Sequence, residues 1–261
     1  GSLVRRDLQA ATATLSAGVE VRRLRAAGET AESAAARFTP VRADVHALFN
    51  PRLDYVSYLF AALLPTLLHV FVLLAAVNSV GAELREGTAG EWLATAGGSL
   101  ARAVAGKMLP STALLVGVAV SATALLFGAA GVPMRGSPAL LLLGTVLFVL
   151  AYQAIGILLV ALFANLRFAT SVAAFLASPA FAYAGITFPT MGMPAFARLW
   201  GSLLPLTHYL RLLVDQSMKG APASVSWPSV LALLGFAVVP LLLAWPRLRR
   251  VASDPSFWGR S

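Results

Sequence analysis

The sequence predicts an all-α protein that crosses a membrane several times. Of its 261 residues, 58% are hydrophobic and 12% are charged, whereas soluble domains are about half apolar and about a quarter charged. The mean hydropathy of +0.78 is correspondingly high. Five long apolar stretches lack Asp, Glu, Lys and Arg. We therefore expect five transmembrane helices, short re-entrant helices on the external side and a small α+β extracytoplasmic piece at the N-terminus.

Residues 1–55 form that N-terminal piece, because they are Ala-rich with scattered charges. Residues 41–47 alternate apolar and polar side chains, which is typical of a half-buried strand, and Asn50-Pro51 predicts a turn. No signal peptide or span precedes this piece, so we expect a fragment of a longer protein and the tail of an extracytoplasmic domain. The two predicted helices are Leu3–Arg25 and Ala31–Arg37.

The five apolar stretches are each about as long as the roughly 20 residues that cross about 30 Å of hydrocarbon. Two Trp residues bracket the last stretch, as in an interfacial aromatic belt. The predicted spans are Val56–Val80, Leu109–Ala130, Ala139–Phe163, Ala169–Phe188 and Trp227–Trp245. They define a transmembrane domain over residues 56–247 and a C-terminal tail over 248–261.

A sixth apolar stretch, Ala195–Met218, does not fit a span. It carries Arg198, Arg211 and Asp215, and Pro205 interrupts it. Non-helical backbone at membrane depth is tolerated only where it is buried in protein or faces a water-filled cavity. We therefore predict two short amphipathic or re-entrant helices here, within an external region over residues 189–225.

The basic residues of the short loops predict the orientation, because cytoplasmic loops carry an excess of Lys and Arg. Eight such residues lie inside when the loop after the first span is cytoplasmic, and four lie outside; the N-terminal arginines are left out of this count. The eight are Arg85, Arg102, Lys107, Arg167, Arg247, Arg249, Arg250 and Arg260, and the four are Arg135, Arg198, Arg211 and Lys219. We expect a multi-pass protein of the bacterial inner (plasma) membrane.

The predicted cytoplasmic loop, residues 81–108, contains a short helix. Thr88 and Glu91 have the spacing of a capping box, in which each side chain pairs with the other's backbone N–H, and Gly97-Gly98 ends the helix. Trp92 is available as an apolar contact. Two interpretations remain open: a capped connector between spans, or a docking helix for a cytoplasmic partner.

The sequence offers no catalytic, metal or nucleotide site. Gly106-Lys107 is followed by Met108, and Ala101 stands where a phosphate-binding loop needs glycine. The histidines lack the close spacing of metal ligands, and the sequence contains no cysteine. The positive charges are not clustered as nucleic-acid binding requires. We expect no cofactor on this chain and no nucleic-acid partner.

Four polar residues of the spans are candidates for lining a path or for bonding between helices: His69, Asn78, Tyr152 and Gln153. Ion-coupled carriers commonly need ionisable groups near the middle of the membrane. Among the predicted spans only His69 is of this kind. We therefore expect that the energy for any transport arrives from outside this chain.

Three segments give the chain a resemblance to the membrane subunits of type-2 ABC exporters, the permease family with an ABCG-like fold. The first is Asn50-Pro51 leading into a span. The second runs from Glu83 through Gly-Thr-Ala-Gly-Glu-Trp-Leu to Gly106-Lys-Met-Leu-Pro110, and the third contains Gly185-Ile-Thr-Phe-Pro189, Met193-Pro194 and Leu204-Pro-Leu-Thr-His-Tyr209. The family has six spans, with a large extracytoplasmic domain after the first in this subgroup. The five spans predicted here fit an N-terminally incomplete member.

The resemblance implies a transporter subunit that is not itself an enzyme and that carries an apolar or amphipathic substrate, as in multidrug efflux. It implies a separate cytoplasmic ATPase with ATP and Mg, a second permease subunit and, commonly, a periplasmic adaptor protein. The coupling residues would be Glu83, Glu86, Thr88, Glu91 and Trp92. The residues of the external gate would be Phe188, Pro189, Pro194, Pro205 and Tyr209.

Two other functions remain open. An ion-coupled secondary carrier would use His69, with Pro65 and Pro179 breaking helices near a midplane site. A membrane-embedded enzyme would use His208 and Asp215, which lie on one helix face together with Arg211.

Overall fold

The computed structural model describes residues 2–28, 30, 55–129, 134–185 and 190–259. The chain divides into two compact units, residues 1–53 and 54–261. The described part of the first unit is essentially one helix, α1 (Ser2–Ala26), which confirms the first predicted helix. The second predicted helix and the predicted strand lie outside the described residues. The α+β character is therefore not confirmed, and the described residues contain no strand.

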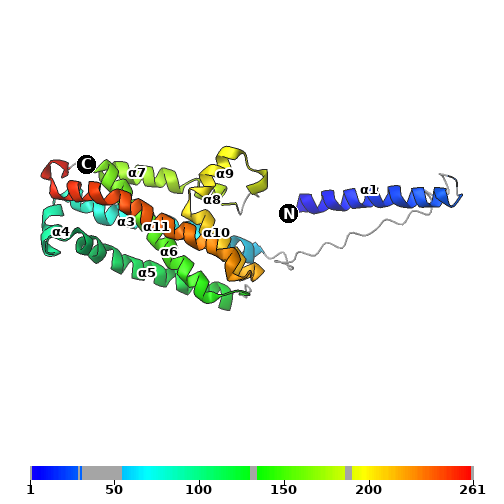
Figure 1. Ribbon diagram of the computed structural model, residues 1–261, viewed down its shortest axis with the longest axis horizontal. Helices are drawn as coiled ribbons and strands as arrows, with labels where there is room; N and C mark the ends of the chain where they lie inside the picture. Colours follow the sequence, from blue (N-terminus) through cyan, green and yellow to red (C-terminus); the bar gives the residue numbers. More distant parts are fainter. Residues whose placement is uncertain (1, 29, 31–54, 130–133, 186–189, 260–261) are drawn as a thin grey trace. The chain divides into compact units, whose positions relative to one another are not determined.

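The second unit is a helical bundle with α6 at its centre (Figure 1). This helix contacts α3, α5, α7, α10 and α11. The helices are α3 (Tyr55–Glu86), α4 (Ala89–Thr95), α5 (Leu100–Gly128), α6 (Pro138–Phe163), α7 (Leu166–Ala177), α8 (Ala180–Tyr183), α9 (Ala195–Ser202), α10 (Pro205–Val214) and α11 (Ala223–Ser253), with a π-helical turn at Asp215–Lys219 and 3-10 turns at Thr190–Gly192 and Pro255–Phe257.

Glycines on α6 allow its neighbours to approach closely. A Cβ at Gly144 would overlap the side chain of Leu212 on α10, and a Cβ at Gly156 would lie 2.8 Å from Ala76 Cβ on α3. Small residues at such contacts are typical of helix packing within membranes, where van der Waals contact replaces the hydrophobic effect as the driving force. The sequence of α6 therefore suits its central position.

The bundle has two ends, which we name by their short helices (Figure 1). The α4 end contains α4, the start of α5, the end of α6 and the C-terminal part of α11; here Arg247 Nε donates to the carbonyl oxygen of Ala161 at 3.3 Å. The α10 end contains α10 and the starts of α6 and α11, and here Ser137 N donates to Gln216 Oε1 at 2.8 Å.

Four helices of the described residues are long and apolar enough to cross a membrane: the Ala62–Glu86 part of α3, and all of α5, α6 and α11. Three of them extend well beyond the predicted spans. The helix α5 begins at Leu100 rather than Leu109 and so includes Arg102 and Lys107. Charged side chains mark where a helix leaves the hydrocarbon, but they do not end the helix itself.

The fifth predicted span, Ala169–Phe188, is not confirmed as a continuous helix. The helix α7 ends at Ala177, and α8 begins only after Ser178-Pro179. Proline has no N–H to donate and its ring clashes with the preceding turn. At 12 residues, α7 is about 18 Å long, which is short of the roughly 30 Å of hydrocarbon. The broken pair α7 and α8 nevertheless carries the chain from the α4 end toward α9 (Figure 1).

The prediction of two short helices in place of a sixth span is confirmed. The helices α9 and α10 contain eight and ten residues and are separated by Leu203-Leu204. Pro205 occupies the first turn of α10, where its missing N–H leaves no helical hydrogen bond unmade.

Candidate functional site

The α4 end begins at a sharp turn between α3 and α4. Gly87 adopts a φ of 75°, a left-handed conformation that glycine reaches without steric cost. The turn brings α4 back beside the last turn of α3 and the first turns of α5, and α4 contacts α3, α5 and α11. A seven-residue helix is thereby placed where three long helices meet.

The predicted capping box is wrong. Thr88 is the N-cap of α4, but its side chain does not cap the helix. The Thr88 hydroxyl instead donates to Glu83 Oε2 at 2.5 Å. A carboxylate is a stronger acceptor than an uncharged group, and such charge-assisted bonds are about twice as strong as neutral ones. The bond to Glu83 directs the Thr88 side chain toward α3, and its oxygen accepts no hydrogen bond from the first turn of α4.

Glu83 is also paired with a residue on α5. Lys107 Nζ lies 2.5 Å from Glu83 Oε1, and the two side chains are 27% and 17% exposed. Lys107 also lies 5.9 Å from the centre of the Trp92 ring, and Trp92 Nε1 donates to the carbonyl oxygen of Ala103 at 3.1 Å. We call Glu83, Thr88, Trp92 and Lys107 the α4 junction, because they connect α3, α4 and α5.

The other two predicted coupling residues point to the surface. Glu86 pairs with Arg85 at 2.6 Å, and both side chains are about half exposed. Glu91 is exposed on α4. The five predicted residues thus separate into three that join helices and two that present carboxylates outward.

The C-terminal segment contributes contacts that the sequence did not predict. Gly259 N donates to the carbonyl oxygen of Leu84 on α3 at 2.8 Å. Trp258 lies against α4, so that a Cβ at Gly90 would be 2.9 Å from its ring, and Trp258 Nε1 donates to the carbonyl oxygen of Val251 at 3.1 Å. In the sequence, the only sign of this contact is a small residue, Gly90, on the face of α4 that Trp258 covers. A single glycine is too weak a signal to predict it.

Three of the four candidate path residues make contacts between helices. His69 is fully buried, and its ring centre lies 5.0 Å from that of Tyr152. The Tyr152 hydroxyl accepts from Leu206 N at 3.3 Å. Gln153 Oε1 accepts from the Thr112 hydroxyl at 2.8 Å. Asn78, by contrast, is exposed on α3.

The predicted gate residues are only partly described, because Phe188 and Pro189 lie outside the described residues. Pro194 is exposed just before α9, whereas Pro205 is buried at the start of α10. The Tyr209 hydroxyl lies 3.0 Å from Thr145 Oγ1. The gate candidates Pro205 and Tyr209 thus pack into the bundle, and Tyr209 attaches α10 to α6.

Asp215, one of the two residues of the enzyme alternative, does not pair with Arg211 of the same helix face. Asp215 pairs with Lys219, the next residue on its own face, at 2.8 Å. His208 Nε2 lies 2.9 Å from the carbonyl oxygen of Ser202. Burial lowers the pKa of His208 below its ordinary value, the Ser202 carbonyl opposes this shift and the charge of Arg211 adds to it. His208 and Asp215 thus bond to different partners and do not form a catalytic pair.

Gln216 is a hub of the α10 end that the sequence analysis missed. It is 1% exposed. Besides accepting from Ser137 N, its Nε2 donates to Ser226 Oγ at 2.7 Å and to the carbonyl oxygen of Ala221 at 3.1 Å. One uncharged side chain therefore joins the π-helical turn that follows α10 to the starts of α6 and α11.

The sequence was compared with models of known protein families, with curated proteins and with solved structures. A family model described as "ABC-2 family transporter protein" matches residues 3–245, which is most of the chain and includes both the α4 junction and Gln216. Comparisons with curated proteins and with solved structures found no match. The bundle of long apolar helices agrees with a multi-pass membrane protein. The chain therefore belongs to the ABC-2 family of transporter permeases, the membrane components of ABC transporters.

Proposed function

We propose that this chain is the permease subunit of an ATP-driven exporter in a bacterial inner membrane, and that its α4 end binds a separate cytoplasmic ATPase subunit. The family supports the class of protein. The orientation is supported by charge, because cytoplasmic ends of membrane helices are rich in Lys and Arg. Basic residues at the α4 end are Arg85, Arg102, Lys107, Arg167, Arg247, Arg249 and Arg250.

The α4 junction is the observation that carries the coupling role. A force applied to α4 has a direct route to two long helices, because Glu83 on α3 binds both Thr88, at the start of α4, and Lys107 on α5. Interior packing resists compression, so packed helices move as units. The exposed carboxylates of Glu86 and Glu91 are available to a basic surface on the ATPase.

ATP and Mg would be bound by the partner, and this chain would supply the translocation path. We propose that the broken pair α7 and α8 serves as a fifth crossing, supported by its course between the two ends of the bundle. A second permease subunit would complete the path for an apolar or amphipathic substrate, and a periplasmic adaptor protein would receive it. Pro205 and Tyr209 would belong to the external gate.

Charge reversal at the exposed carboxylates tests the docking role. The double variant Glu86→Lys, Glu91→Lys should reduce the amount of ATPase subunit that co-purifies with the permease, because like charges across an interface cost binding energy. Both side chains are exposed, so membrane insertion and thermal stability should be unchanged. The matched control is Asp7→Lys, which reverses an exposed carboxylate on α1.

Normal ATPase recovery with the double variant would contradict the proposed docking surface. Equal loss of the ATPase with Asp7→Lys would show that the effect is not specific to the α4 end. Export measured in proteoliposomes containing both subunits should fall in parallel with ATPase recovery.

A secondary carrier driven by protons is the other candidate, and one observation favours it. Both ring nitrogens of the buried His69 lack a hydrogen-bond partner among the described residues, and a buried ionisable residue within a span is a candidate functional site. Collapse of the proton gradient at constant ATP distinguishes the two functions. Such a collapse should leave export by an ATP-driven permease intact and should stop export by a proton-driven carrier.

A further inference from the structure

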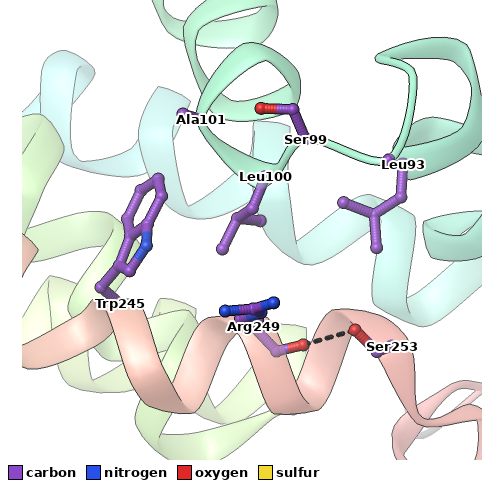
Figure 2. A pocket seen from close by; sticks show the side chains of 8 residues that line it. Leu93, Ser99, Leu100, Ala101, Trp245, Arg249 and Ser253 are labelled. Carbon is purple, nitrogen blue, oxygen red and sulfur yellow. Dashed lines mark hydrogen bonds between the residues drawn. The ribbon is translucent and has the colours of Figure 1, made fainter.

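A cavity of about 360 Å³ opens at the α4 end, between the start of α5 and the C-terminal part of α11. Its volume is several times the roughly 30 Å³ that a water molecule occupies in the liquid. Figure 2 shows Trp245 and Arg249 extending from α11 toward Leu100, with Leu93 on the opposite side of the view from Trp245. The side chains that line the cavity include Leu93, Ser99, Leu100, Trp245, Arg249 and Ser253.

Arg249 is the only charged residue among those that line the cavity. No hydrogen bond or ion pair within the described part of the chain involves its guanidinium, although its backbone oxygen accepts from Ser253 Oγ (Figure 2). The neighbouring Arg247, in contrast, donates to Ala161 and lies 5.5 Å from the Phe257 ring. A guanidinium presents donors in a planar fork that matches the oxygens of a phosphate or carboxylate.

The face of α11 that carries Arg249 changes character along its length. Leu242, Trp245, Arg249 and Ser253 follow one another at spacings of three or four residues, so they share one face of the helix. Leu242 is 66% exposed, as expected of a side chain that contacts lipid. Trp residues concentrate at the level of the lipid headgroups, and Arg249 lies about 6 Å further along the helix axis.

This face of α11 is apolar at Leu242 and positively charged at Arg249. A ligand that fits both parts has an apolar portion beside Leu242 and an anionic group beside Arg249. A soluble anion would use only the second of these surfaces. A carboxylate of a partner protein would likewise leave the lipid-facing part of the stripe unexplained. We propose that this cavity binds the phosphate group of an anionic phospholipid from the leaflet at the α4 end, with the acyl chains along the Leu242 face.

Lipid binding by the whole purified permease tests this site without any ATPase. Phosphatidylglycerol and phosphatidylcholine with identical acyl chains are titrated in detergent, and the bound lipid is counted by native mass spectrometry. Arg249→Gln should weaken phosphatidylglycerol binding by about tenfold or more, as expected for the loss of a charge-assisted pair. Arg250→Gln is the matched control, because it removes the same charge from the adjacent exposed position, and it should change binding by less than about twofold.

A further variant keeps the test decisive if Arg249→Gln does not yield folded protein. Arg249→Lys retains the charge but not the planar fork, and it should give an affinity between those of the other two proteins. Equal binding of phosphatidylglycerol by the wild type and by Arg249→Gln would overturn the proposal. Equal loss of binding in Arg250→Gln would do so too, because binding would then follow total charge.

Two further arms identify the source of the anion. Millimolar inorganic phosphate should not displace the lipid, and complete displacement would indicate a site for soluble phosphate instead. If Arg249→Gln retains lipid but loses the ATPase subunit from the complex, the cavity binds a protein carboxylate and the lipid proposal is wrong. Because the lipid measurement needs no ATPase, its result is independent of the proposed coupling role.

Discussion

The two ends of the bundle are held together by different chemistry. At the α4 end, a partly exposed ion pair between Glu83 and Lys107 connects α3 with α5. At the α10 end, the uncharged and fully buried Gln216 connects the π-helical turn after α10 with α6 and α11. The side chains of Glu83 and Lys107 remain partly in contact with water, whereas the Gln216 side chain is buried and bonds to protein groups.

This difference bears on how each end responds to a force. A buried polar group that loses its partners has no water to replace them, so the α10 end resists opening. A partly solvated ion pair contributes little net energy and can exchange partners at small cost. The comparison therefore suggests that the α4 end adjusts when a partner binds while the α10 end keeps its arrangement.

The largest effect is expected from Gln216→Leu. This substitution leaves Ser137 N, Ser226 Oγ and the Ala221 carbonyl oxygen without their partner, and it should lower the free energy of unfolding by about 3 kcal/mol. Thermal unfolding of the purified protein in detergent measures the change.

Gln153→Leu is the control for that substitution within the same chain. Gln153 is also buried, but its hydroxyl partners Ser111 and Thr112 each have a second bond to the Met108 carbonyl oxygen. The loss of stability should be about 1 kcal/mol. If Gln153→Leu destabilised the protein as much as Gln216→Leu, the special role of the α10 hub would be refuted.

A double-mutant cycle sharpens the contrast at the other end. Glu83→Gln and Lys107→Gln, separately and together, should give a coupling energy of about 1 kcal/mol, because the pair is partly exposed. Nucleotide-driven export should nevertheless fall several-fold in either single variant, since the ionic connection between α3 and α5 is lost and, among the described hydrogen bonds, only that from Trp92 to Ala103 still joins α4 to α5. Loss of stability without loss of export would argue that the α4 junction is only structural.

Trp92→Phe is expected to have a smaller effect on stability. The ring stays but the bond from its Nε1 to the Ala103 carbonyl oxygen is lost, which should cost at most about 1 kcal/mol. ATPase activity of the reconstituted complex should become less responsive to substrate. The control is Trp227→Phe, whose side chain is 47% exposed at the start of α11 and should leave this response unchanged.

Much of the fold could be predicted from the sequence, because membrane helices follow from length and apolarity alone. The spans at α3, α5, α6 and α11 were found in this way. The stretch Ala169–Phe188 was instead predicted as one span, and a break at Pro179 was considered only for the carrier alternative. Proline is tolerated in many membrane helices, and its effect depends on the neighbours that satisfy the freed backbone groups.

The candidate site was less predictable, because it depends on which of several neighbours each polar side chain bonds. The spacing of Thr88 and Glu91 suits a capping box, yet the Thr88 hydroxyl donates to Glu83 and does not cap α4. Local spacing does not show that α3 continues to Glu86 and brings Glu83 into reach. Gln216 was missed for a similar reason, as its partners lie about ten and eighty residues away.

The smallest effect is expected at His69, between the two ends. Leu is close to His in size, and His69→Leu removes two ring nitrogens that have no hydrogen-bond partner in the described part of the chain. Stability should therefore be unchanged or slightly increased. Export driven by ATP should stay within about twofold of the wild type, a change of less than about 0.5 kcal/mol. Abolished export in a stable, well-folded variant would instead favour the proton-driven carrier.

The most direct test of the central claim is photocrosslinking from the surface of α4 in intact cells. A photoreactive benzoyl-phenylalanine replaces Glu91, and in a parallel strain it replaces Met191, which is 93% exposed and belongs to the region proposed to be external. We predict a crosslink from position 91 to the ATP-binding subunit and none from position 191. A crosslink to that subunit from position 191 but not from position 91 would contradict both the orientation and the coupling role.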